Sequence, residues 1–164
     1  MSWVVYACLA LGLSSALVGG VFQSFSDFVM RGLLDAEPAG GMESMQQLNR
    51  TVYRSTFLAI FMALVPATLA MAIYAWLKLS GAPQGFIIAA AIVYVTSVFL
   101  VTAAGNVPMN NQLDALAPTS ADGHAYWATY GRVWTRWNHV RTLGSVVVAG
   151  LFLLASVQLA AAAE

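Results

Sequence analysis

Two polar clusters lie in a chain that otherwise consists largely of apolar residues. They are Gly105-Asn106-Val107-Pro108-Met109-Asn110-Asn111 and Thr135-Arg136-Trp137-Asn138-His139-Val140-Arg141. Both border stretches that are apolar enough to cross a membrane, where polar and ionisable side chains are costly and usually functional. Amides donate and accept hydrogen bonds, a guanidinium fits an oxyanion, and an imidazole can move a proton near neutral pH. The two clusters therefore combine donors for an oxyanion with a group that can transfer a proton.

The composition indicates what kind of scaffold must position these clusters. Hydrophobic residues make up 60% of the chain and charged residues 9%, against roughly 25% charged residues in soluble domains. With about 20 apolar residues needed per crossing, we expect an all-α membrane protein, a bundle of four transmembrane helices in one domain over residues 1–164. The net charge is zero and no basic run occurs, so nucleic acid is excluded as a partner.

The apolar stretches predict where the four helices lie. No Lys or Arg precedes the first stretch, which favours a transmembrane helix over a signal peptide. Gly105 and Pro108 are expected to end the third helix. The fourth follows directly from an amphipathic stretch that ends at Arg141. The expected spans are Trp3 to about Phe22 with a continuation to Leu34, Phe57 to Leu77, Phe86 to about Ala104, and about Thr142 to Ala162.

Both longer connections show helical periodicity, and we expect an amphipathic helix in each. In the first, one face carries Met45, Gln46 and Asn49, and the opposite face is charged. Basic residues predict that both connections are cytoplasmic and both termini are outside. The basic residues are Arg31, Arg50 and Arg54 in the first connection, Arg132, Arg136 and Arg141 in the third, and Lys78 alone on the other side.

Because both connections lie on one side, polar groups from distant stretches could meet in one cavity at that end of the bundle. Helical phase places Trp134, Asn138 and Arg141 on one face. In a continuous helix His139 is turned about a quarter of a circle from Asn138, so a cap or kink near Thr142 would be needed to bring them together.

Structural roles remain open for most of these residues. The asparagines around Pro108 could cap a helix, the exposed arginines could reach lipid phosphates, and the tryptophans could form an interfacial belt. Cys8 is expected to pack in the apolar interior. Small residues spaced four apart, Gly12, Ala16 and Gly20 together with Ser15 and Gly19, could bring helices close within the bundle or between copies in a homo-oligomer.

Four blocks of the sequence resemble the DUF1772 integral membrane family, which includes the anthrone oxygenases of aromatic polyketide pathways. The resemblance covers nearly the whole chain and implies oxidation of a tricyclic anthrone to an anthraquinone by dioxygen. Many members are bacterial, so it implies a bacterial inner-membrane location. The blocks are Phe22-Gln23-Ser24-Phe25-Ser26-Asp27-Phe28-Val29-Met30, Gln47-Leu48-Asn49-Arg50, Gly105 to Leu113, and Trp134 to Arg141.

This resemblance, combined with the residue chemistry, suggests a role for each candidate. His139 would be the base, Arg141 and Asn138 would donate to the developing enolate oxygen, and Asp27 would orient the imidazole or pair with an arginine. The expected substrate contacts are Asn106, Asn110, Asn49, Trp134, Trp137, Arg136 and Ser24.

No cofactor is predicted, because the sequence has no dinucleotide, phosphate-loop or haem-attachment motif. The expected partners are the bilayer, a lipophilic aromatic molecule and dioxygen. One alternative is a protein that binds or passes a lipophilic molecule such as a quinone without reaction. Another is a metal- or haem-dependent oxidoreductase, with copper, iron or haem bound by His139 together with Asp27 or His124.

Overall fold

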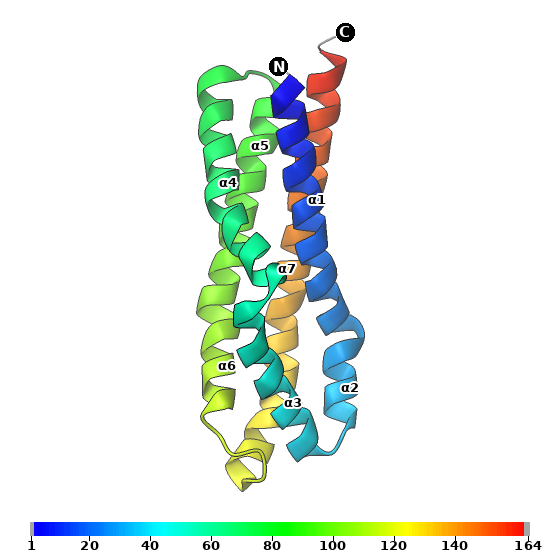
Figure 1. Cartoon of the computed structure of the whole chain (residues 1–164), viewed down its shortest axis with the longest axis vertical. Coiled ribbons are helices and arrows are strands. Elements are labelled where there is room, and N and C mark those ends of the chain that lie inside the picture. The colour runs from blue at the N-terminus through cyan, green and yellow to red at the C-terminus, as the bar shows by residue number, and fades with distance from the viewer. Residues whose placement is uncertain (1, 163–164) are drawn as a thin grey trace.

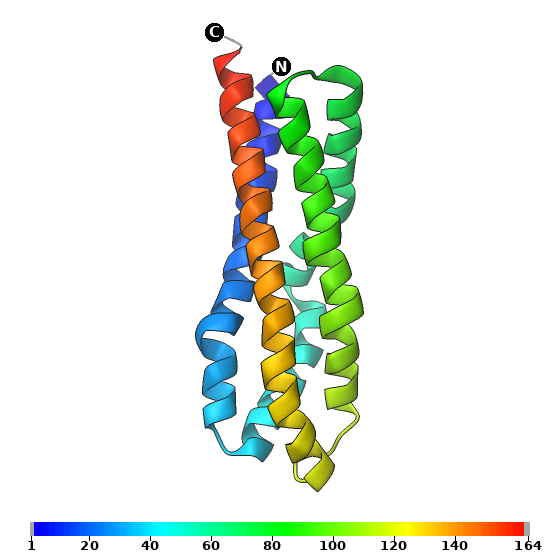
Figure 2. The same cartoon turned by 180° about the vertical axis from the view of Figure 1, so that it is seen from behind.

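The computed structural model of the protein describes residues 2–162 as four long helical rods that run alternately up and down. Both termini lie at one end of the bundle, and α2, α3 and α6 lie at the other (Figures 1 and 2). The elements are α1 (Ser2–Ser24), the π-helical turn η1 (Phe25–Val29), α2 (Met30–Asp35), α3 (Pro38–Thr51), the short 3₁₀ turn η2 (Val52–Arg54), α4 (Thr56–Lys78), α5 (Ala82–Val93), the π-helical segments η3 (Tyr94–Phe99) and η4 (Thr102–Asn106), α6 (Val107–Asp114) and α7 (Ala121–Ala161).

Four helices within the described part of the chain are long and apolar enough to cross a membrane, which confirms the predicted number of spans. They are Trp3–Asp35, Thr56–Lys78, Ala82–Asp114 and Ala121–Ala161. The first of these helices extends past Phe22 through η1 and α2, which confirms the predicted continuation to Leu34.

The prediction that Gly105 and Pro108 end the third helix was wrong. The rod continues through η4 and α6 as far as Asp114. Pro108 lies at the first turn of α6, where a helix does not need a backbone N–H. The π-helical segment directly before it changes the hydrogen-bond register. The chain can therefore pass the proline without a break.

The amphipathic stretch and the fourth span form one uninterrupted helix, α7. At 1.5 Å per residue it is about 60 Å long, twice the roughly 30 Å of a bilayer core. Arg141 lies at its midpoint. The part from Thr142 to Ala161 has no charged residue, whereas the earlier half carries all the charges of the helix. Arg141 therefore marks the boundary between the apolar half and the polar half.

Small residues allow α1 to lie directly against α7. A Cβ added to Gly19 would lie 3.0 Å from the Cβ of Ser145, so a larger side chain would force the helices apart. Ser15 is buried, whereas Ala16 and Gly20 are exposed. The close contact is thus made within this chain, and a contact between copies stays a prediction.

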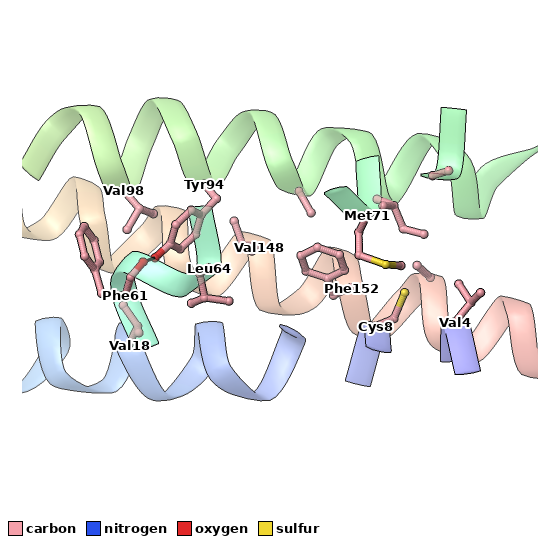
Figure 3. Close-up of a cluster of buried hydrophobic side chains, with 14 of the residues drawn as sticks. Val4, Cys8, Val18, Phe61, Leu64, Met71, Tyr94, Val98, Val148 and Phe152 are labelled. Carbon is pink, nitrogen blue, oxygen red and sulfur yellow. Dashed lines mark hydrogen bonds between the residues drawn. The ribbon is translucent and has the colours of Figure 1, made fainter. Parts of the chain in front are cut away.

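Figure 3 shows the apolar core. It occupies the half of the bundle nearer the termini, because its members on α1 lie between Val4 and Phe22 and those on α7 between Val148 and Leu159. Cys8 lies within it, fully buried, as expected for a packing residue.

The Tyr94 hydroxyl donates to the Phe61 carbonyl over 2.7 Å. Phe61 lies five residues before Pro66, the proline inside α4. Pro66 removes the helical donor to the Met62 carbonyl, so the Tyr94 bond joins η3 to α4 one residue before the carbonyl that the proline leaves free.

At the other end, α3 is held against α7 and α6 by the face that its periodicity predicted. The Gln46 amide donates to the carbonyls of Leu113 and Leu116, which lie at the end of α6. The Leu113 carbonyl also accepts from the Leu116 N–H at 3.2 Å, so the two amide bonds serve to hold α3 against the C-terminal end of α6. The charged face of α3 is exposed. A second buried cluster completes this contact, made of Met30, Met42, Met45, Leu113, Trp127, Tyr130 and Trp134.

Candidate functional site

A partly open pocket of about 150 Å³ lies between the two buried clusters, where α1, α3, α4, α6 and α7 meet. Its wall is mainly apolar and aromatic, which is typical of a site for a small lipophilic molecule. The polar residues in the wall are Asn49, Thr102, Asn110, Asn138 and Arg141. The others are Val21, Phe22, Phe25, Met45, Leu48, Val52, Tyr53, Phe57, Leu58, Phe61, Val107 and Trp134.

Arg141 is the charged group of this pocket, and it is only 6% exposed. Its Nη2 donates to Asn138 Oδ1 at 2.6 Å, and its Nη1 donates to the Thr102 hydroxyl at 3.3 Å. Its buried Nε has no hydrogen-bond partner among the described residues. Within residues 2–162 the ion pair recorded is Arg50 with Asp114, on the surface. The guanidinium is thus a buried cation that no carboxylate neutralises.

Two aromatic rings lie against this guanidinium. Its Cζ is 4.3 Å from the ring centre of Phe22 on α1 and 5.2 Å from that of Trp134 on its own helix. Such cation–π contacts are attractive, especially away from water. They stabilise the charge, but they provide no hydrogen-bond acceptor for Nε.

Asn138 fixes the position of the guanidinium. Its Nδ2 donates to the Phe22 carbonyl and to the Ser26 hydroxyl, both at 2.6 Å, while its Oδ1 accepts from Arg141. Both N–H groups of the amide are therefore used by α1 and η1. Asn138 has no donor left for a substrate oxygen, so the donor role expected for it does not fit the structure, and its contacts make it a positioning residue.

Asn110 is held in one orientation by α7. Its Oδ1 accepts from Trp134 Nε1 at 2.9 Å and from the Tyr130 hydroxyl at 2.8 Å. Because an indole N–H can only donate, the amide oxygen must face Trp134. No acceptor for Asn110 Nδ2 is recorded within the described part of the chain, which leaves this donor free. Asn49 lies beside the same network and donates to the Tyr130 hydroxyl at 3.4 Å.

Three of the expected residues are near the pocket but do not line it. Asn106 is buried, and its Nδ2 donates to the Trp134 carbonyl at 3.2 Å, so it connects η4 to α7. Ser24 donates to the Gly20 carbonyl of its own helix. Asp27 is exposed. The expectation that Ser24 and Asp27 point into the cavity was wrong, because Phe22 and Ser26, four residues apart, form the face toward α7, and Ser24 and Asp27 lie on the other side of the helix.

Further along α7, His139, Arg136 and Trp137 lie on the exposed side, and none of them lines the pocket. The helix has no kink near Thr142 that would turn His139 inward. The base role expected for His139 therefore lacks a geometric basis. His124 is also exposed. Among the described residues, no three His, Cys, Asp or Glu side chains form a group that could hold a metal ion, and this includes the set His139, Asp27 and His124.

Sequence reasoning did not single out Ser26, Thr102 or Tyr130. Ser26 and Thr102 contact Asn138 and Arg141 directly. Both belong to π-helical turns, but each lies four residues after a buried apolar residue, Phe22 and Val98 respectively, so helical spacing is a signal that could have found them. Tyr130 could have been found, since it lies four residues before Trp134 on the same helical face.

The sequence profile of the anthrone oxygenases matches residues 50–151, which is more than half of the chain. The chain belongs to the anthrone oxygenase family. No curated protein and no solved structure matches it.

The part that matches the anthrone oxygenases carries most of the polar wall of the pocket. It runs from the end of α3 through most of α7 and includes Thr102, Asn110, Asn138 and Arg141. Phe22 and Asn49 lie outside it. The family match and the pocket therefore coincide in the residues that surround the buried guanidinium.

Proposed function

We propose that this protein is a membrane-embedded oxygenase that oxidises a lipophilic aromatic substrate, anthrone-like or phenol-like, with dioxygen. The single observation that carries this is Arg141, a buried cation with an unpaired Nε in the wall of an aromatic pocket. Preorganised donors in a site that excludes water are among the strongest stabilisers of a developing oxyanion. The family name supports the reaction class.

For an anthrone the chemistry balances without any further reductant. Loss of one proton from the ring carbon opposite the carbonyl gives an enolate, whose oxygen carries the charge. That carbon then forms a bond to dioxygen, and the resulting hydroperoxide loses water. One anthrone and one O₂ thus yield one anthraquinone and one H₂O. Arg141 and the free Nδ2 of Asn110 would hold the enolate oxygen.

The pocket is large enough for one aromatic ring. A closed apolar cavity of about 150 Å³ holds a benzene molecule, and the pocket here has about the same volume. The rest of a tricyclic substrate must therefore extend through the open side. Leu48 and Tyr53 are the lining residues classed as exposed. Since both are lipophilic, we propose that the substrate enters from the bilayer between them.

The test is oxygen uptake by purified protein in lipid nanodiscs, with a hydroxyanthrone as substrate and empty nanodiscs as the blank for its autoxidation. We expect Arg141→Met to lower the enzymatic rate by roughly 100- to 1000-fold, as loss of one oxyanion donor typically does. Arg136→Met is the matched control, because Arg136 is exposed on the same helix. A wild-type rate equal to the blank contradicts the proposal.

One observation favours a second candidate, a membrane protein that binds a quinone-like molecule without reacting. Among residues 2–162, no Asp, Glu, His or Lys lines the pocket, so the described wall offers no ordinary general base. Saturable quinone binding with no oxygen uptake above the blank would support this candidate. A metal- or haem-dependent reaction predicts instead a stoichiometric metal or a visible absorption band, and loss of oxygen uptake after dialysis against a chelator or removal of haem.

The proposed location is a bacterial inner membrane, with both termini outside and the α2–α3 and α6–α7 ends cytoplasmic. The positive-inside rule supports this orientation. The two polar ends lie together at one end of the bundle (Figure 1). Labelling of single cysteines at Ser120 and Ser80 with a membrane-impermeant reagent, in the Cys8→Ser background, tests it. Only the cysteine at position 80 should react in intact cells from which the outer membrane has been removed.

A further inference from the structure

The pocket contains a positive charge, and none of the described residues that line it has a side chain that would ordinarily accept a proton. Arg141 is the charged residue in its wall, and the other polar groups are three amides, a threonine and a tyrosine hydroxyl. His139 is on the exposed side of α7. A neutral substrate that had to lose a proton inside the pocket would therefore find no base there.

Burying a cation without a counter-ion is costly, and the cost is several kcal/mol even after relaxation. The partners of Arg141 reduce this cost but do not cancel the charge. Asn138 and Thr102 provide neutral acceptors for Nη2 and Nη1, and Phe22 and Trp134 provide ring faces. The unpaired Nε is the donor that a ligand oxygen could still use. An anion in the pocket would neutralise the site.

The ligand must also suit an aromatic wall. Phe22, Phe25, Phe57, Phe61 and Trp134 all contribute to it, and a ring-sized volume is available beside the guanidinium. A simple inorganic anion would leave these apolar faces unfilled. An oxyanion attached to an aromatic ring would fill both parts of the pocket at once.

We infer that the pocket takes its substrate as an aryloxide, the conjugate base of a phenol or of an enol, and discriminates against the neutral form. This inference rests on the proposed function, because it concerns the same pocket and names the class of its substrate. The bond that breaks is the O–H bond of the phenol or enol. Its proton passes to water at the surface of the membrane, before the substrate enters the pocket, and the electron pair stays on the oxygen that comes to lie beside Arg141.

This assignment explains how an anthrone could react without a base in the wall. An anthrone is in equilibrium with its enol tautomer, which is a phenol. The enol ionises at oxygen, where Arg141 stabilises the charge, and the ring carbon that reacts with dioxygen is already electron-rich in the anion. No protein group has to remove a proton from carbon.

The test uses p-nitrophenol, a single-ring phenol whose anion is yellow, with p-nitroanisole as the neutral analogue of the same shape. Purified wild-type protein in nanodiscs of uncharged lipid is titrated with each, without any turnover. We expect the pKa of the bound phenol to be lowered by about 1 to 3 units, since an opposite charge within 4–6 Å has that effect. We expect p-nitroanisole to bind at least tenfold more weakly. An unchanged pKa or equal affinities overturn the inference.

Two variants test whether Arg141 is the group that lowers the pKa of the bound phenol. Arg141→Met should abolish the shift of the probe pKa, and Arg136→Met should leave it intact. Retention of the shift in Arg141→Met contradicts the role of Arg141. If Arg141→Met does not fold, the comparison of p-nitrophenol with p-nitroanisole in the wild-type protein still tests whether the pocket prefers the anion.

The outcome is separable from that of the oxygenase proposal. A lowered probe pKa without oxygen uptake above the blank supports the aryloxide site and contradicts the oxygenase function. Oxygen uptake above the blank with an unshifted probe pKa supports the oxygenase function and contradicts the aryloxide site.

Discussion

The Asn138 amide accepts a hydrogen bond from the Arg141 guanidinium at 2.6 Å while both of its own N–H groups are held by the first rod of the bundle. The amide cannot rotate without losing two bonds. The first rod therefore fixes the position of Arg141 through Asn138, although Arg141 belongs to α7. The contact between α1 and α7 thus determines where the positive charge of the pocket lies.

This relationship predicts the effect of Asn138→Asp. A carboxylate at this position would pair with Arg141 and neutralise the pocket, and it could no longer donate to the Phe22 carbonyl. We expect the shift of the p-nitrophenol pKa to disappear, together with oxygen uptake, while the protein still unfolds cooperatively on heating. Asn111→Asp adds the same charge at an exposed position. It should change neither the shift of the p-nitrophenol pKa nor the oxygen uptake. Full activity in Asn138→Asp would show that the charge of Arg141 is not needed.

The exposed position of His139 predicts that it is not needed for turnover. Its side chain lies outside the pocket, and the aryloxide form of the substrate needs no base from the protein. We expect His139→Ala to keep oxygen uptake within about twofold of the wild type, because no proton transfer to this side chain is part of the proposed reaction. A loss of activity of more than tenfold would restore His139 as the proton acceptor.

The free Nδ2 of Asn110 predicts a contribution to turnover. Asn110→Leu removes a donor that Trp134 and Tyr130 hold in place, and we expect a decrease in kcat on the order of 100-fold. Asn111→Leu, the exposed neighbour, serves as the control. If both variants have the same kcat, the amide of Asn110 does not contact the reacting oxygen.

The packing of α7 against η3 predicts a position that does not tolerate a side chain. A Cβ on Gly144 would lie 2.9 Å from the Cβ of Ser97, whereas a Cβ on Gly150, in the same helix, meets nothing within 4 Å. We expect Gly144→Val to lower the free energy of unfolding by about 1–3 kcal/mol relative to Gly150→Val, because overpacking has that cost. Thermal unfolding in detergent followed by circular dichroism measures the difference. Equal midpoints would mean that the helices separate without cost.

The hydrogen bond between Tyr94 and the Phe61 carbonyl predicts a smaller effect on stability. Tyr94→Phe removes this buried hydrogen bond between η3 and α4, and we expect a loss of about 0.5–1.5 kcal/mol in unfolding free energy. Tyr6→Phe makes the same change on an exposed tyrosine and should have little effect. Similar losses in both variants would contradict a specific role for the bond.

Much of the scaffold was predictable because each helix carries its own pattern. The absence of charge from Thr142 to Ala161 predicts the fourth span without any knowledge of its neighbours. The periodicity of α3 correctly placed Gln46 inward and Arg50 outward, because the burial of a helical face follows a repeat of 3.6 residues. The resemblance of the sequence blocks correctly indicated the family.

The site itself was only partly predictable. Asn138 and Arg141 were correctly assigned to one helical face, which a continuous α7 preserves. Asp27 and Ser24 were placed at the cavity because they follow the end of the first span. In the structure Ser26, four residues after Phe22, contacts Asn138 instead.

The sequence by itself determined the four apolar rods, their amphipathic ends and the presence of a guanidinium at the edge of a span, because these depend on composition and on local periodicity. Only the tertiary structure decided that Arg141 is buried without a counter-ion, that Asn138 has no donor to spare, and that His139 faces away. The physical reason is that charge compensation and hydrogen-bond pairing depend on which groups of α1, η1 and η4 reach α7. Close packing between helices sets those distances, and it leaves no periodic signal in the chain.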